Sequence, residues 1–113
     1  MKLITIDIKS ERQTVSEAIA QFEIEAESYK KGGYKVMKVI HGYGSHGVGG
    51  AIRSEFLKKC EQLKRQKKIE DYICCDKWPA GGTVKKIAIN YCADLIADKE
   101  LHFVNPGCTI VIL

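Results

Sequence analysis

The chain opens with a loose alternation of apolar and polar residues over positions 2–8, which predicts a first strand. A helix is expected to begin soon after it, because Thr14 and Glu17 form the T-x-x-E pattern of a capping box. From there the apolar residues recur every three or four positions, as on the buried face of an amphipathic helix. Gly32 and Gly33 are expected to end this helix.

The rest of the chain continues the same alternation of strands and helices. An apolar run at 34–40 predicts a second strand, and helical periodicity returns over about 50–66. A third strand is predicted over 72–78 and a third helix over 83–91, whereas the residues after that helix follow no regular pattern. The final segment, 109–113, is almost continuously apolar, which is typical of a buried strand.

This order of elements predicts an α/β fold in a single domain that spans residues 1–113. A helix separates the first two strands, so they are expected to be parallel and joined by a right-handed crossover. Asp7 and His41 stand at the ends of these strands. Both are therefore predicted at the carboxyl edge of the sheet, where open α/β sheets bind ligands.

A glycine-rich segment between the second strand and the second helix is the candidate binding site. Its glycines are Gly42, Gly44, Gly47, Gly49 and Gly50. Glycine reaches positive φ without steric cost, so such a loop can turn several N–H groups toward one point. The positive end of the following helix favours an anion there, which predicts a bound phosphate. A tight turn without a ligand is the competing interpretation, but so many glycines favour a binding loop because each has a large entropic cost.

Composition narrows the class of protein only moderately. The chain is 45% hydrophobic and 28% charged, which is ordinary for a globular domain. Neither a membrane span nor a signal peptide is recognisable, so no membrane partner and a cytoplasmic location are expected. The five cysteines have no zinc-site spacing and are predicted to be reduced thiols. A redox role for the adjacent Cys74 and Cys75 stays open, although alternating burial in a strand is the favoured interpretation.

The net charge of +4 is concentrated in the middle of the chain, where residues 34–78 hold ten bases and five acids. Cations stabilise the C-terminal end of a helix, which explains part of this surplus. Between 58 and 68, however, six bases accompany a single acid, so we also expect a surface for a polyanion. These bases are Lys58, Lys59, Lys64, Arg65, Lys67 and Lys68.

Four motifs are specific in combination and span nearly the whole chain. They are Ile6-Asp7-Ile8 before the capped helix, IHGYG at 40–44, GGAIR at 49–53 and the final NPGCTIVIL. With them the chain resembles the Smr domain, the small MutS-related domain. The resemblance implies a compact two-layer α/β sandwich with a mixed four-stranded sheet, similar to the C-terminal domain of bacterial initiation factor 3. It also implies nucleic-acid binding, with DNA favoured over RNA, and in some members nicking of DNA or cleavage of RNA.

The sequence departs from the family pattern in the first motif. The family has L-D-x-H there, so Lys9 occupies the place of the histidine that is associated with cleavage. A lysine whose pKa is unshifted stays protonated, which makes it a poor general base although it can hold a phosphate. We therefore expect this protein to bind nucleic acid better than it cuts it.

The predicted mechanism combines the loop, the strand ends and the basic surface. The backbone of Gly42–Gly50 and the side chain of Arg53 would hold a backbone phosphate, and the surface at 58–68 would follow the flanking strand. His41 is expected at the mouth of the loop as general acid or base. Asp7 would orient it or recruit Mg²⁺ or Mn²⁺, although no cofactor or metal is certain.

Two other functions stay open. Gly42-x-Gly44-x-x-Gly47 satisfies the dinucleotide fingerprint, which would indicate a nucleotide-binding enzyme fragment. That fingerprint belongs to the first strand–helix turn and expects an acid about 20 residues later, where a basic helix is predicted here. The other function is an interaction module without catalysis. The oligomeric state and the preferred structure of the nucleic acid are also open.

Overall fold

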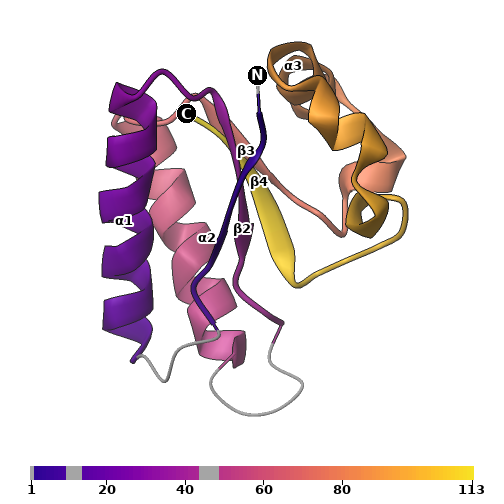
Figure 1. Ribbon diagram of the computed structural model, residues 1–113. Helices are drawn as coiled ribbons and strands as arrows, with labels where there is room; N and C mark the ends of the chain where they lie inside the picture. The colour runs from indigo at the N-terminus through magenta and orange to yellow at the C-terminus, as the bar shows by residue number, and fades with distance from the viewer. Residues whose placement is uncertain (1, 10–13, 44–48) are drawn as a thin grey trace.

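The computed structural model describes residues 2–9, 14–43 and 49–113, and its elements follow the predicted α/β order (Figure 1). The strands are β1 (Ile4–Asp7), β2 (Val36–Ile40), β3 (Asp71–Cys74) and β4 (Cys108–Ile112). The helices are α1 (Val15–Lys31), α2 (Gly49–Arg65) and α3 (Thr83–Tyr91), together with the short 3-10 helices η1 (Trp78–Ala80), η2 (Ala93–Ala97) and η3 (Lys99–Leu101).

The strands form one mixed sheet in the order β1-β2-β4-β3, so the prediction of a mixed four-stranded sheet is confirmed. β1 and β2 are parallel, with Ile6 opposite Val39, as the intervening helix predicted. β4 is antiparallel to both of its neighbours, β2 and β3. The carboxyl ends of β1, β2 and β3 therefore lie at one edge of the sheet, together with the start of β4.

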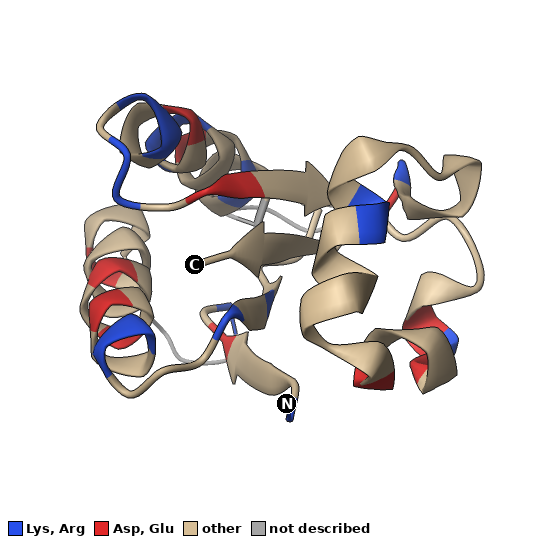
Figure 2. Ribbon diagram, turned by 90° about the horizontal axis from the view of Figure 1, so that it is seen from above, with Lys and Arg blue, Asp and Glu red and all other residues tan. Residues whose placement is uncertain are grey.

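The two faces of the sheet are covered differently (Figure 2). α1 and α2 lie on one face, where Phe22 and Phe56 pack edge to face with ring centroids 4.7 Å apart. The sheet and this helical layer form the predicted two-layer sandwich. The segment from Trp78 to Leu101 covers the opposite face and encloses a second apolar core, which includes Leu95 and Ile110.

Local chemistry explains where α1 begins and ends. The Thr14 hydroxyl accepts from the Glu17 N–H (3.1 Å), and the Glu17 carboxylate accepts from the Thr14 N–H (2.9 Å). The predicted capping box is therefore confirmed, since two helix-start N–H groups are satisfied reciprocally. At the other end Gly33 has φ of 90°, a conformation that a residue with a Cβ rarely adopts.

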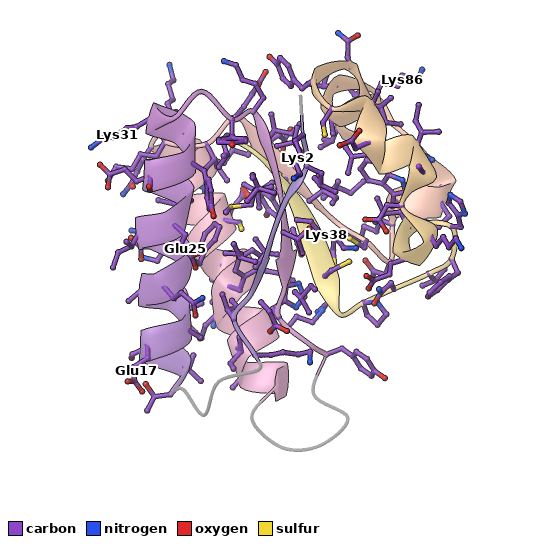
Figure 3. All side chains as sticks on the ribbon, in the orientation of Figure 1. Lys2, Glu17, Glu25, Lys31, Lys38 and Lys86 are labelled. Atoms are coloured by element: carbon purple, nitrogen blue, oxygen red, sulfur yellow. The ribbon has the colours of Figure 1, made fainter. Side chains whose placement is uncertain are left out.

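Two segments differ from the predicted pattern. β3 ends at Cys74, short of the predicted Trp78, because the Lys77 N–H donates to the Cys74 carbonyl (3.0 Å) and turns the chain into η1. The pattern-free stretch after α3 folds into η2 and η3, which a buried lysine holds against the sheet. Lys38, only 3% exposed, lies 2.8 Å from Asp98 and 3.0 Å from Glu100 (Figure 3).

The charge of Lys38 is retained despite its burial. Desolvation by itself would lower the pKa of Lys38, but hydrogen bonds to Asp98 and Glu100 and their charges outweigh it and raise the pKa above its ordinary value. The ion pairs thus fix a segment whose sequence carries no helical or strand periodicity.

Candidate functional site

The predicted carboxyl edge of the sheet is tied together by backbone hydrogen bonds. The Ile8 N–H donates to the Ile40 carbonyl at 3.0 Å. The N–H groups of His41 and Gly42 both donate to the Gly107 carbonyl, each at 3.0 Å. The ends of β1 and β2 and the turn before β4 therefore form one continuous surface, which brings Asp7 and His41 to the same edge as predicted.

The side chain of His41 is enclosed in the protein, whereas the sequence predicted it at the mouth of the loop. Its side chain is 0% exposed, and its ring packs against Phe56 of α2 with centroids 5.0 Å apart. Nδ1 lies 2.6 Å from the Gly42 carbonyl and Nε2 lies 2.8 Å from the Thr109 hydroxyl. The imidazole is therefore enclosed where a general acid or base was expected, because α2 and β4 cover the end of β2.

The surroundings of His41 also fix its protonation state. Burial is the main cause that lowers the pKa of His41 to about 4, the Gly42 carbonyl opposes it, and the charge of Arg53 adds to it. The ring is thus neutral near pH 7. A carbonyl only accepts, so Nδ1 donates to Gly42 and Nε2 accepts from the Thr109 hydroxyl. Both nitrogens are engaged inside the protein, which leaves this histidine no direct route to a substrate.

Lys9 and Gly42 lie against each other at the surface of the edge. Gly42 has φ of 73°, and a Cβ built on it would lie 3.1 Å from Cδ of Lys9, so the alkyl chain of Lys9 passes over this glycine. The Lys9 N–H donates to Oδ1 of Asp7 at 2.9 Å. The structure therefore groups Asp7, Lys9 and Gly42, all of which the sequence predicted as site residues.

Arg53 reaches the same edge from the second turn of α2. Its Nε donates to the Pro106 carbonyl at 3.1 Å, and its Nη2 lies 3.8 Å from Oδ2 of Asp76. The side chain of Arg53 is still 30% exposed. The guanidinium is thus positioned between the turn before β4 and the end of β3 while part of it faces solvent. Of the predicted loop glycines, Gly49 and Gly50 begin α2, whereas Gly44 and Gly47 lie outside the described residues.

Two residues of this edge were missed by sequence reasoning. Tyr43 is 57% exposed, and its ring edge lies against Gly107, where an added Cβ would be 3.3 Å from Cδ1 of Tyr43. Its place inside the H-G-Y-G motif was the available signal. Asp76, by contrast, carries no motif, and its Oδ1 is a buried oxygen without a hydrogen-bond partner in the described part of the chain.

The predicted basic surface is largely neutralised by acids. Lys58 pairs with Glu55 (3.3 Å), Lys59 with Glu23 (3.3 Å), Lys64 with Asp71 (3.1 Å) and Arg65 with Glu61 (3.9 Å). Two of these acids belong to other elements, Glu23 to α1 and Asp71 to β3. α2 has 17 residues, so these bases extend to about 24 Å from its start. The last of them therefore lies well away from the carboxyl edge.

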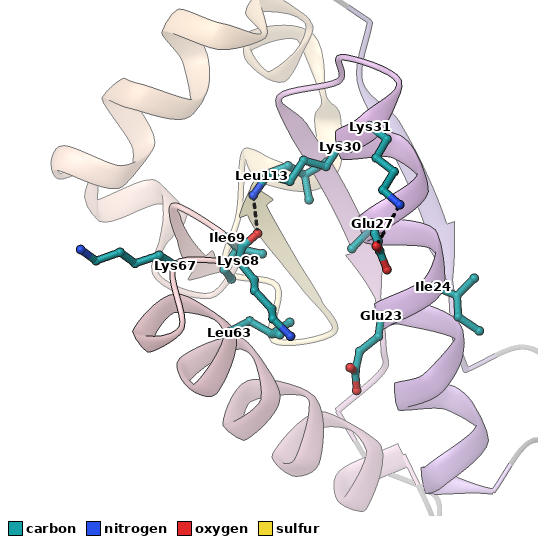
Figure 4. Close-up of a pocket in the computed structure, with 11 residues that line it drawn as sticks. Glu23, Ile24, Glu27, Lys30, Lys31, Leu63, Lys67, Lys68, Ile69 and Leu113 are labelled. Atoms are coloured by element: carbon teal, nitrogen blue, oxygen red, sulfur yellow. Dashed lines mark hydrogen bonds and ion pairs between the residues drawn. The ribbon is translucent and has the colours of Figure 1, made fainter.

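Lys67 and Lys68 line a cavity of about 700 Å³ between the C-terminal ends of α1 and α2 (Figure 4). Its floor is apolar, and its rim also carries Lys30, Lys31, Glu23 and Glu27. Lys31 pairs with Glu27 at 3.1 Å, and Nζ of Lys30 donates to the Lys68 carbonyl at 2.7 Å. Two helix C-termini and two glutamates thus offset the lysines, and the cavity has no clear preference for an anion.

A divalent ion at Asp7 stays a prediction. Among residues 2–9, 14–43 and 49–113, no group of three or more His, Cys, Asp and Glu side chains is placed to hold a metal ion. Within the same residues, no helix combines the length and the apolar character that crossing a membrane requires.

Comparisons with known proteins add no relative. No protein-family model, no curated protein and no solved structure matches this chain. The resemblance to the Smr domain therefore rests on the four motifs.

Proposed function

We propose that the protein binds nucleic acid at the carboxyl edge of its sheet, as a single Smr-like domain that acts in the cytoplasm. The observation that supports this best is the grouping of two cations, Lys9 and Arg53, with the start of α2 and with Gly42, over which the stem of Lys9 passes. An exposed aromatic ring, Tyr43, borders the group. Cations, a helix start and a stacking surface are what a phosphodiester with attached bases needs.

The phosphate would lie at the start of α2. The first N–H groups of a helix have no partner within it and carry a partial positive charge. Arg53 adds a planar donor that suits phosphate oxygens, and Lys9 adds a point charge. The lack of a Cβ at Gly42 lets the stem of Lys9 pass close over the backbone and so places the lysine at this edge.

A polymer is favoured over a dinucleotide by the order of the strands. In a dinucleotide-binding unit, the strand after the glycine turn and its helix lies beside the first strand and ends in the acid that holds the ribose. Here antiparallel β4 separates β3 from β2, so an acid after β3 is not on the neighbouring strand. Tyr43 also faces solvent, which suits a base of an extended chain.

Hydrolysis is proposed to be slow. General acid or base assistance contributes roughly 10² to 10⁴ in rate and needs a group that titrates near the working pH. His41 is neutral and enclosed, and Lys9 replaces the motif histidine. We therefore propose binding as the main function, with DNA preferred to RNA and nicking weak.

The test compares two exposed lysines that carry the same charge. Affinity of labelled branched DNA, duplex, single strand and structured RNA is measured by anisotropy across a salt series for wild type, Lys9→Gln and Lys86→Gln. Lys86 lies on α3, on the other face of the sheet (Figure 3). We expect Lys9→Gln to weaken binding and to reduce the salt slope by about 1, and Lys86→Gln to have no effect.

Equal effects of the two substitutions would reject the carboxyl edge as the interface. Absence of salt-dependent binding by the wild type to all four nucleic acids would reject the function itself.

A further inference from the structure

Two cysteines face each other where β3 ends and β4 begins. In the register Cys74 is opposite Thr109, so the next pair is Cys75 and Cys108, and the Cys75 N–H donates to the Cys108 carbonyl at 2.9 Å. Both are buried, at 0% and 1% exposure, in the core under α3. Directly opposite residues of antiparallel strands project on the same face.

The spacing expected of residues placed in this way suits a disulfide. Hydrogen-bonded opposite residues of an antiparallel pair have Cα atoms about 5.5 Å apart, close to the commonest spacing in disulfides. Cys74 is on the other face of the sheet, where Nη2 of Arg53 lies 3.5 Å from its sulfur. The adjacent cysteines therefore alternate between faces, and only Cys75 shares a face with Cys108.

The surroundings of the pair make its two thiols chemically different. A hydrogen bond from the Cys75 thiol lowers the pKa of Cys108, burial opposes this, and the ammonium of Lys38 adds to it. The same hydrogen bond and burial raise the pKa of Cys75. Cys108 therefore loses its proton more readily than Cys75 and becomes a thiolate, which is the nucleophilic form of cysteine, whereas Cys75 keeps its proton.

We propose that Cys75 and Cys108 are an oxidation site at which a peroxide closes a disulfide between the end of β3 and the start of β4. The Cys108 thiolate attacks one oxygen of hydrogen peroxide, the O–O bond breaks, and the leaving hydroxide takes a proton to become water. Cys108 is then a sulfenic acid. The sulfur of Cys75 attacks the sulfur of Cys108, the S–O bond breaks, and hydroxide leaves with the Cys75 proton as water.

Across both steps, two thiols and one peroxide give one disulfide and two waters. Two electrons pass from sulfur to oxygen. Peroxide reaches the buried pair when β3 opens locally, since β3 is a four-residue strand at the edge of the sheet. The disulfide would fix the start of β4 next to Gly107, which holds the N–H groups of His41 and Gly42.

The test treats the whole protein with hydrogen peroxide, blocks the remaining thiols, and maps the products by mass spectrometry. We expect loss of two hydrogen atoms, a crosslinked peptide that joins Cys75 to Cys108, and reversal by a thiol reductant. A crosslink between other cysteines, or oxidation of Cys108 to sulfinic acid without a crosslink, would overturn the proposal. So would thiols that stay reduced when an unfolded sample under the same conditions is fully oxidised.

Serine variants supply the matched controls. Cys75→Ser should leave a sulfenic acid on Cys108 that dimedone traps, whereas Cys92→Ser, in the same core, should still form the crosslink. Loss of the crosslink in Cys92→Ser, or an untrapped Cys108 in Cys75→Ser, would contradict the assigned roles. If either variant fails to fold, the peptide map of the wild type still decides.

Discussion

Replacement of His41 by glutamine tests whether its ring is a buried, neutral part of the fold. The ring is 0% exposed, and its pKa is lowered to about 4 by burial, whereas an imidazole of the unfolded chain titrates near 6.5. Between these two values the unfolded chain binds more protons than the folded chain. The stability that the neutral ring contributes is therefore present above pH 6.5 and is lost as the pH falls toward 4.

The magnitude follows from the two pKa values. The gap between 6.5 and about 4, at about 1.36 kcal/mol per pKa unit, amounts to roughly 3 kcal/mol. Urea unfolding is measured from pH 4 to 7.5 for wild type and His41→Gln. We expect the difference in free energy of unfolding between them to shrink by roughly this amount from pH 7 to pH 4, because carboxylate titration is common to both and cancels.

His102 supplies the matched control, because it is an exposed histidine whose Nε2 lies 3.1 Å from the Ile96 carbonyl. His102→Gln should give a curve parallel to that of the wild type. A constant difference between wild type and His41→Gln across the pH range would refute the reasoning. An NMR titration that places the pKa of His41 near 6.5 would do the same, and would restore it as a candidate acid or base.

Further predictions concern single side chains at other places in the fold. Lys38→Met should lower the free energy of unfolding by about 2 kcal/mol in urea, because it removes two charge-assisted hydrogen bonds, whereas Lys58→Met at the surface should change it by less than about 0.5 kcal/mol. Lys67 has φ of 59°, which strains a residue with a Cβ, so Lys67→Gly should relieve about 1 kcal/mol of backbone strain and raise the melting temperature. An unchanged melting temperature would show that the backbone is not strained there. Gly42→Ala should cost about 1 to 2 kcal/mol in the same unfolding assay and weaken DNA affinity, since φ is 73° and the new Cβ would press on the Lys9 stem; unaltered affinity would place the phosphate elsewhere. Lys9→His should raise single-turnover nicking of DNA with little change in affinity, and a loss of activity would indicate that the lysine cation itself assists the reaction.

Features that depend on short stretches of chain could be predicted from the sequence. The capping box of α1 needs only Thr14 and Glu17, and the parallel pairing of β1 and β2 needs only the helix between them. Asp7 and Lys9 meet at the edge because they are two residues apart. These predictions succeeded since each depends on residues within one continuous stretch of chain.

Features that depend on distant partners could not be predicted in this way. The bases at the end of α2 were counted against the one acid between 58 and 68, but Glu23 and Asp71 neutralise two of them from other elements. The irregular stretch after α3 carries no periodicity, because two separate apolar residues, Leu95 and Leu101, and the ion pairs with Lys38 hold it in place of a regular apolar face. Charge counts along a sequence therefore overstate a patch when its counter-charges arrive through the fold.

The burial of His41 also depends on a partner that is distant in the sequence, and it gives the histidine of the H-G motif a structural role. Its Nε2 partner, Thr109, is 68 positions away, and no pattern near His41 indicates that contact. The ring connects this hydroxyl of β4 to the Gly42 carbonyl, while the Gly107 carbonyl holds the N–H groups of both His41 and Gly42. Gly42 is thereby fixed at positive φ beneath Lys9 by contacts that need no ligand. The backbone at this position is thus ordered in advance, so binding of a phosphate beside it would involve little further loss of conformational entropy, and the contacts of the motif histidine position the glycine.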